Sequence, residues 1–194
     1  MSLIEPHGGR LIDREARGAE RESLLRAAAH MPELTLSARA EADMELIAQG
    51  ALSPLEGFMG EADYVLVRDQ RRLANGLVWT IPVTLSATGE ERAKLKIGDD
   101  VALRSRDGRL LAVLHLAEIF KYDKHLEAER VYQTAEEKHP GVKALYAQGE
   151  HLLGGHVSVV DHSRRHEFAP YRYTPRELRA LFAERGWRSV VAFQ

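Results

Sequence analysis

The sequence predicts an α+β fold, a small β-barrel or sandwich with flanking helices, followed by the first helix and strand of an α/β unit. Three observations predict it. Apolar residues alternate with polar ones from Leu77 to Ile119, several shorter segments have the helical period, and the character of the chain changes after about residue 168. We therefore expect a domain over residues 1–168 and the start of a second domain over residues 169–194.

Two helices are predicted near the amino terminus. The stretch Ala19–His30 is rich in strong helix formers, and Met31-Pro32 ends it. A second helix is predicted to begin after Ser37 as N-cap, with an apolar stripe of Ala40, Met44 and Ile47. Gly50 supplies the residue that can turn left-handed at its end.

The next stretch, Gly50–Tyr64, contains three glycines and a proline, yet it also carries Leu52, Leu55, Phe58 and Met59. A solvated loop has no need of these apolar side chains. We expect a loop docked against the rest of the protein, with a direct role in substrate binding as the less favoured alternative.

Strands are predicted in the central part of the chain. Leu77–Ser86 alternates but contains Pro82, which restricts it to an edge or a bulge. Gly98–Ile119 is the clearest hairpin, with Asp107-Gly108 as its turn. Helices are predicted within Glu127–Glu137 and at Pro140–Gly149, where Pro140 opens the helix after His139.

The last segment reads as one helix and one strand. Thr174 as N-cap, Pro175 at the first helical position and Glu177 three residues after the cap mark a helix start, and Gly186 ends the helix. The apolar run Arg188–Phe193 is predicted to be a buried parallel strand, although no further units follow to cover it. Ligands bind beyond the carboxyl ends of such strands, so Gln194 is a candidate binding residue, with a frayed end as the plain alternative.

Composition excludes several classes of function. The chain of 194 residues has 44% hydrophobic and 29% charged residues, and 27 basic against 29 acidic residues give a net charge of -2. No overall field favours nucleic acid or an anionic membrane. The absence of cysteine excludes thiolate catalysis and cysteine-bound zinc within this stretch. With no apolar run near 18 residues and no leader pattern, we expect a cytoplasmic protein.

Several motifs together resemble the sulfate adenylyltransferase family. They are the loop Gly-x-x-Ser-Pro-Leu-x-Gly-Phe-Met at Gly50–Met59, the stretch Thr-x-x-x-x-His-Pro-Gly-Val at Thr134–Val142, and the closing segment Arg176–Gln194. The resemblance implies a PUA-like β-barrel domain followed by a Rossmann-like nucleotidyltransferase domain. The family's first catalytic strand ends in Gln-x-Arg-Asn-Pro, of which only Gln194 is present here.

The resemblance also implies a chemistry. A sulfate oxygen attacks the α-phosphate of MgATP, which gives adenosine 5'-phosphosulfate and pyrophosphate. Such a reaction needs arginine, histidine and amide donors more than a general base. We expect Gln194 to bind sulfate, the catalytic residues and the Mg²⁺ that accompanies ATP to lie outside these 194 residues, and the protein to be a homo-oligomer that is inactive as this piece alone.

The polar stretch before the last helix allows two other interpretations. Basic and aromatic residues alternate there and could bind single-stranded RNA; they are Arg164, Arg165, Phe168, Tyr171, Arg172, Tyr173 and Arg176. We prefer a strap between domains, with aromatic side chains packed on the barrel and arginines paired with acidic residues. His156, His162 and His166 could approach one another, but without a convincing helix or carboxylate set we expect no metal site.

Overall fold

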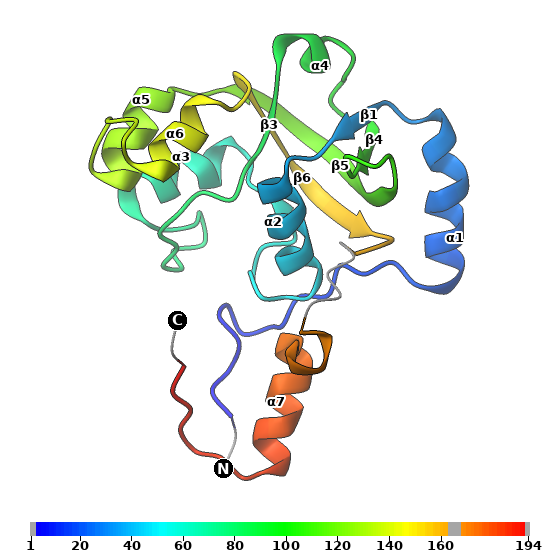
Figure 1. Cartoon of the computed structure of the whole chain (residues 1–194), viewed down its shortest axis with the longest axis vertical. Helices are drawn as coiled ribbons and strands as arrows, with labels where there is room; N and C mark the ends of the chain where they lie inside the picture. The colour runs from blue at the N-terminus through cyan, green and yellow to red at the C-terminus, as the bar shows by residue number, and fades with distance from the viewer. Residues whose placement is uncertain (1–2, 163–167, 193–194) are drawn as a thin grey trace.

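The computed structural model describes residues 3–162 and 168–192. In chain order its elements are α1 (Gly18–Ala27), η1 (Ala28–His30), β1 (Glu33–Thr35), α2 (Ala38–Ala48), β2 (Gly57–Phe58), α3 (Glu61–Gln70), β3 (Leu85–Ala87), α4 (Gly89–Ala93), β4 (Asp100–Arg104), β5 (Leu110–Lys121), α5 (Lys124–Glu127), η2 (Ala128–Tyr132), α6 (Pro140–Tyr146), β6 (His151–Val159), η3 (Ala169–Tyr171) and α7 (Pro175–Glu184). Figure 1 shows the strands gathered in one body, with α7 below it.

The six strands form one mixed sheet. Its order is β1-β4-β5-β6-β2, with β3 paired to β6, and all pairs except the parallel β1-β4 pair are antiparallel. No pairing in the described residues joins β1 to β2 or β3, so the expected barrel is open at this point. A register shift between Leu116 and Glu118 bends the long strand β5, which lets the sheet curl around its core.

One edge of β6 is covered by three short segments rather than by one strand. From the start of β6 to its end, β3 pairs with His151–Leu153, β2 pairs with Gly155 and His156, and Glu15 forms a parallel bridge with Val159. The three segments come from distant parts of the sequence. Because each satisfies a few backbone groups of β6, the strand has a partner along most of this edge.

The main core lies between α2 and the sheet, and Figure 1 shows α2 in front of β6. The predicted stripe Ala40, Met44 and Ile47 is buried, and the Ser37 hydroxyl caps the helix by accepting a hydrogen bond from the amide of Ala40. Gly50 has φ +81°, as its place after the helix requires. The sequence therefore predicted this helix, its buried face and both of its ends correctly.

The predicted hairpin is also confirmed. Val101 pairs with Leu114 and Leu103 with Ala112. The turn differs from the two-residue turn predicted at Asp107-Gly108, because Ser105 and Arg109 enclose a three-residue loop in which Gly108 has φ +84°. Another difference is that both faces are buried: Ala102 and Val113, on the face opposite the main core, are fully covered.

The strand predicted at Leu77–Ser86 is mostly wrong. Only Leu85–Ala87 is a strand, and residues 77–84 are irregular apart from a bridge between Val78 and Arg72. Pro82 lacks an amide proton and interrupts the ladder, so the alternating pattern could not be read as continuous pairing. The helix within Glu127–Glu137 likewise ends at Tyr132, where Gln133 takes a left-handed conformation with φ +58°.

A smaller apolar cluster joins α5, η2 and α6. Ala128, Val142 and Leu145 are buried together, and α6 begins after His139 with Pro140 at its first position, as the sequence predicts. Glu127 is buried between this cluster and the main core, where its carboxylate accepts a hydrogen bond of 2.9 Å from the Tyr64 hydroxyl. Burial raises the pKa of Glu127, and the hydrogen bond and the cations Arg39 and Arg68 offset only part of that effect.

The helix predicted near the carboxyl end is present. In α7, Thr174 and Glu177 form the expected capping box, and Gly186 has φ +63°. The strand expected at Arg188–Phe193 is not formed over Arg188–Ala192, the described part of that stretch. A strand requires a hydrogen-bonded neighbour, and the described residues offer none at this place, so Val190 and Val191 are exposed.

Candidate functional site

The candidate binding residue Gln194 lies outside the described residues. The structure describes the segment of chain that leads to it. Helix α7 and residues 187–192 form that segment, and we call them the carboxyl-terminal unit. No side chain of α7 is buried, although Leu178, Leu181 and Phe182 make an apolar face. The indole of Trp187 packs on Phe182 at 5.9 Å between ring centroids, and the Arg185 guanidinium lies 5.1 Å from its centre.

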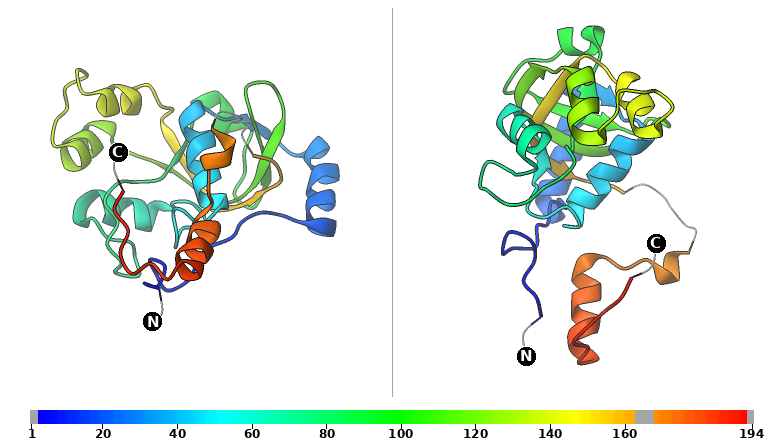
Figure 2. Two further views of the ribbon diagram at one scale, coloured as in Figure 1. Left: turned by 60° about the horizontal axis from the view of Figure 1, so that its bottom comes forward. Right: turned by 90° about the vertical axis from the view of Figure 1, so that its left-hand side faces the viewer.

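The residues before α1 attach this unit to the sheet. We call residues 3–17 the amino-terminal arm; Figures 1 and 2 show it running from the sheet toward α7. Arg176 of α7 donates to the Asp13 carboxylate at 3.1 Å, and Arg179 donates to the carbonyl of Ile4 at 2.6 Å. The arm thus provides two polar contacts that hold the helix beside the domain.

The arm is itself fixed to the domain at several points. The Arg14 guanidinium donates to the carbonyl of Val157 at 2.8 Å, and the Arg14 amide donates to the carbonyl of Ala48. His7 donates to the carbonyl of Val78 at 2.9 Å. Sequence reasoning missed the arm because its charged residues, spaced without a helical or alternating period, carry no signal of what they contact.

Asp13 has cations on two sides. Burial, the largest single influence, acts to raise its pKa, but the hydrogen bond from Arg17, the backbone amide of Glu15 and the charges of Arg17 and Arg176 together lower it. The carboxylate therefore stays ionised at neutral pH. Ion pairs this exposed contribute little free energy individually. The arm therefore holds α7 mainly through the number of its contacts.

The basic and aromatic stretch differs from its predicted role as a packed strap. Phe168, Tyr171 and Tyr173 have exposed fractions of 66%, 80% and 51%, so these aromatic side chains do not pack on the barrel. The expected pairing of an arginine with an acidic residue is confirmed for Arg176 and Asp13. Arg164, Arg165 and His166 lie outside the described residues.

The loop Gly50–Tyr64 is docked, as predicted. Leu55, Phe58 and Met59 are buried in the main core. Gly57 permits a close backbone approach to β6, because a Cβ atom at this position would overlap the carbonyl oxygen of Gly155 and lie 2.7 Å from Cα of His156. The glycine of this motif is therefore explained by packing.

A pocket of about 430 Å³ opens beside the loop. Its ionisable lining residues are Glu56, Asp63, Glu118 and His156. Two of these carboxylates cap backbone amides: Glu118 accepts from Glu61 at 2.7 Å, and Asp63 accepts from Ala74 at 2.7 Å. With three acids and one histidine, the pocket does not favour sulfate or a phosphate.

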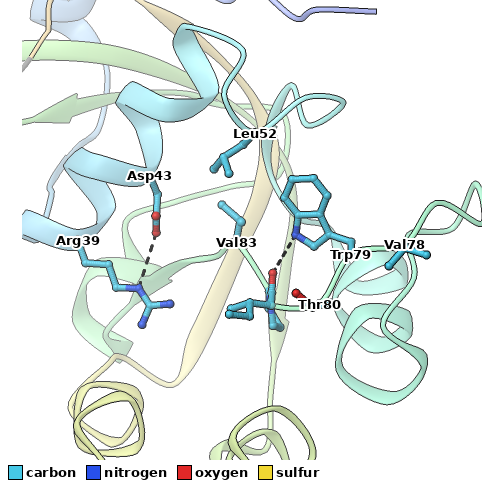
Figure 3. A pocket seen from close by; sticks show the side chains of 9 residues that line it. Arg39, Asp43, Leu52, Val78, Trp79, Thr80 and Val83 are labelled. Atoms are coloured by element: carbon cyan, nitrogen blue, oxygen red, sulfur yellow. Dashed lines mark hydrogen bonds and ion pairs between the residues drawn. The ribbon is translucent and has the colours of Figure 1, made fainter. Parts of the chain in front are cut away.

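A second pocket, of about 380 Å³, lies between α2 and residues 78–83. Figure 3 shows Asp43 pointing toward Arg39 and the Trp79 indole pointing toward the neighbouring backbone. The indole nitrogen donates to the carbonyl of Ile81 at 2.9 Å, whereas the nearest atoms of Arg39 and Asp43 are 3.8 Å apart. The lining is apolar apart from this ion pair and Thr80.

Within residues 3–162 and 168–192, no group of three histidine, aspartate or glutamate side chains is placed to hold a metal ion. In the same ranges no helix has the length and apolar character needed to cross a bilayer. His162 lies 3.1 Å from the Glu15 carboxylate and His156 lies 3.9 Å from Glu56, so these two histidines face different carboxylates.

A model of the PUA-like domain matches residues 4–162. The chain belongs to the PUA-like domain family. The match covers the sheet, the docked loop and residues 78–83, so the lining residues of both pockets lie within the matched part of the chain.

Similar sequences are sulfate adenylyltransferases, which confirms the resemblance drawn from the motifs. The chain is 51% identical to that of Symbiobacterium thermophilum over 98% of its own length and 48% of the relative. It is 47% identical to that of Synechococcus sp. strain JA-3-3Ab and 46% to that of Halothermothrix orenii, again over 98% and 99% of this chain. The chain spans about half the length of these curated relatives.

A solved structure shows the same fold beyond the PUA-like match. The hexameric APS kinase from Thiobacillus denitrificans superposes with a TM-score of 0.74 and 33% sequence identity. The superposition covers 96% of this chain and 32% of that one. The likeness therefore extends to nearly all of the 194 residues.

Proposed function

We propose that this chain is the amino-terminal part of a sulfate adenylyltransferase. The observation that carries the proposal is the 51% identity over 98% of the chain to a protein of that name, whose length is about twice as great. In this proposal residues 1–168 form the PUA-like domain and residues 169–194 begin a Rossmann-like nucleotidyltransferase domain. ATP, with its Mg²⁺, binds to polypeptide that follows Gln194, and sulfate binds to Gln194 together with that polypeptide.

The chemistry assigned to the whole protein is attack of a sulfate oxygen on the α-phosphate of ATP, with pyrophosphate as leaving group. Gln194 is neutral, so its amide donates a hydrogen bond to sulfate without supplying charge. The excess of acidic groups around the 430 Å³ pocket supports placing both anionic substrates elsewhere. We further propose a cytoplasmic homo-oligomer, supported by a structural neighbour that is described as hexameric.

The experiment compares the 194-residue chain with the protein encoded by the complete reading frame. Pyrophosphate release is measured with ATP, Mg²⁺ and sulfate, and adenosine 5'-phosphosulfate is identified by mass. We expect activity only from the longer protein. A longer protein without activity would refute the assignment, and activity in the 194-residue chain would refute the placement of the catalytic residues.

A variant of the longer protein tests the role of Gln194. Gln194→Ala removes the donor and is expected to raise the KM for sulfate at least tenfold, because a hydrogen bond to a charged group contributes about 1.5–3 kcal/mol. The KM for ATP should change less than twofold. Equal changes in both constants would indicate a structural role for Gln194 instead.

A second candidate function is RNA binding by the stretch Arg164–Arg176. The observation in its favour is the exposure of Phe168, Tyr171 and Tyr173, since unpacked aromatic rings offer stacking platforms for bases. Fluorescence anisotropy of a labelled 20-nucleotide oligouridine tests it at 50 and 200 mM salt. Salt-sensitive binding that Tyr171→Ala abolishes would support this function, and no binding at 50 mM salt would exclude it.

A further inference from the structure

The 380 Å³ pocket has an apolar rim that is left uncovered. Val78 and Ile81 have exposed fractions of 53% and 49%, and they flank Trp79, whose indole is half-buried between them and the main core. Residues 77–84 are not part of any strand, so these side chains are not covered by a second layer of the sheet. The rim extends the apolar lining from the pocket onto the surface.

The floor of the pocket carries a carboxylate with little compensation. The Asp43 side chain is only 22% exposed, and the closest cationic atom, Nε of Arg39, is 3.8 Å away, which is beyond hydrogen-bond distance. Burial raises the pKa of Asp43, and Arg39 offsets only part of that effect.

Two carboxylates share the positive charge of Arg39. Its charge acts on the buried Glu127 as well, which has Arg68 as a further cationic neighbour. One guanidinium thus faces two carboxylates that are largely removed from water. The pocket therefore favours an added positive charge, and its apolar rim favours aliphatic neighbours of that charge.

We propose that this pocket is the docking site for a lysine or arginine side chain, flanked by apolar residues, from the polypeptide that follows Gln194. The long side chain of such a residue passes its methylene groups along Trp79, Val78 and Ile81 and places its charged end at Asp43. The contact joins the PUA-like domain to the half of the protein that its relatives possess in addition.

The choice of occupant rests on the proposed function and on two observations. The matched relatives are about twice as long as this chain, so a large body of polypeptide remains to be placed against it. The rim of Val78 and Ile81 is a spread-out apolar surface, and such a surface suits a protein segment better than a small ligand enclosed on all sides.

Hydroxyl-radical labelling with mass spectrometry tests the docking. The rate of oxidation at Trp79 is measured in the 194-residue chain and in the protein from the complete reading frame, at equal concentration. We expect the longer protein to oxidise at Trp79 at least fivefold more slowly. Equal rates in the two proteins would overturn the proposal.

Asp43→Asn separates docking from folding. In the 194-residue chain the change removes a poorly compensated buried charge, so we expect the Tm to rise by about 1–3 °C. In the longer protein the same change should restore at least half of the Trp79 oxidation. Glu45→Gln makes the same change of charge on the same helix outside the pocket lining, and it should leave the oxidation of Trp79 unchanged.

Ile81→Ser provides a second variant that leaves the fold intact, because Ile81 is half exposed. It should leave the Tm of the 194-residue chain within about 2 °C and raise Trp79 oxidation in the longer protein. If neither variant raises that oxidation although Trp79 is protected, a different surface covers it and the proposal fails.

Two further outcomes identify other occupants or separate the proposals. Protection of Trp79 that appears in the 194-residue chain as its concentration rises would assign the pocket to a second copy and overturn the proposal. Pyrophosphate release is measured on the same samples. A longer protein that protects Trp79 but lacks activity refutes the enzyme assignment alone, while an active protein with Trp79 equally exposed refutes only the docking.

Discussion

Replacing Gly57 by alanine should be among the most destabilising single-methyl changes in this domain. The added Cβ would overlap the carbonyl oxygen of Gly155 and lie 2.7 Å from Cα of His156, whereas ordinary contacts between carbon atoms are about 3.5–4.0 Å. Strands β2 and β6 must therefore separate by about 1 Å. The loop that carries the buried Leu55 and Phe58 would move with β2.

The size of the effect follows from these contacts. Forcing a methyl group into a packed site costs about 1–3 kcal/mol, and a weakened backbone hydrogen bond between Val157 and Glu56 adds about 1 kcal/mol. We expect a loss of about 2–4 kcal/mol in the free energy of unfolding, measured by urea titration, and a fall in Tm of roughly 6–12 °C.

Gly89→Ala is the matched control. Nothing lies within 4 Å of a Cβ at Gly89, which is the first residue of α4 and has no positive φ. Because alanine restricts the unfolded chain more than glycine, the control should be neutral or stabilise the protein by up to about 1 kcal/mol. The packing argument is refuted if Gly57→Ala unfolds within about 0.5 kcal/mol of the control.

Four further predictions concern polar groups. Burial raises the pKa of Glu127 in the folded state above its ordinary 4.5, so the protein loses stability as the pH rises from 4.5 through the raised value. Glu127→Gln should flatten this dependence of Tm on pH. An unchanged slope would contradict the prediction. Glu127→Ala instead leaves the Tyr64 hydroxyl without its carboxylate acceptor and should cost about 1–3 kcal/mol at pH 4.5, measured by urea titration. Thr174→Ala removes the cap of α7 and should speed amide hydrogen exchange in that helix about fivefold. The Tm should stay constant, because α7 buries no side chain. A large fall in Tm would refute this. Asp13→Ala should raise tryptic cleavage at Arg176 several-fold, and Glu20→Ala, on the exposed first turn of α1, should not.

Much of the fold follows from local signals in the sequence. Ser37 and Gly50 mark both ends of α2, Thr174 and Glu177 mark the start of α7, and Gly108 marks the hairpin turn, because each of these requirements is met within a few residues. The prediction of a strand over residues 77–84 was wrong because the alternating apolar side chains of this segment contact the pocket on one side and the core on the other. Such contacts produce the same pattern as a strand without any pairing.

The candidate site could be predicted only in part. The sequence indicated Gln194 and the apolar face of α7, but Gln194 lies outside the described residues and α7 buries no side chain in them. The Trp79 pocket was not predicted, because Arg39 and Asp43 are an ordinary pair four residues apart on a helix. Only the fold brings residues 78–83 over them.

The attachment of the amino-terminal arm sets a time order for folding during synthesis. Arg14 donates to the carbonyl of Val157, 143 residues later in the chain, and Glu15 bridges to Val159. At translation rates of about 5–20 residues per second, these two contacts wait roughly 7–30 s for β6 to be made. During that interval the arm is open to proteases and chaperones, so residues made early in this domain are secured only after β6 has been made.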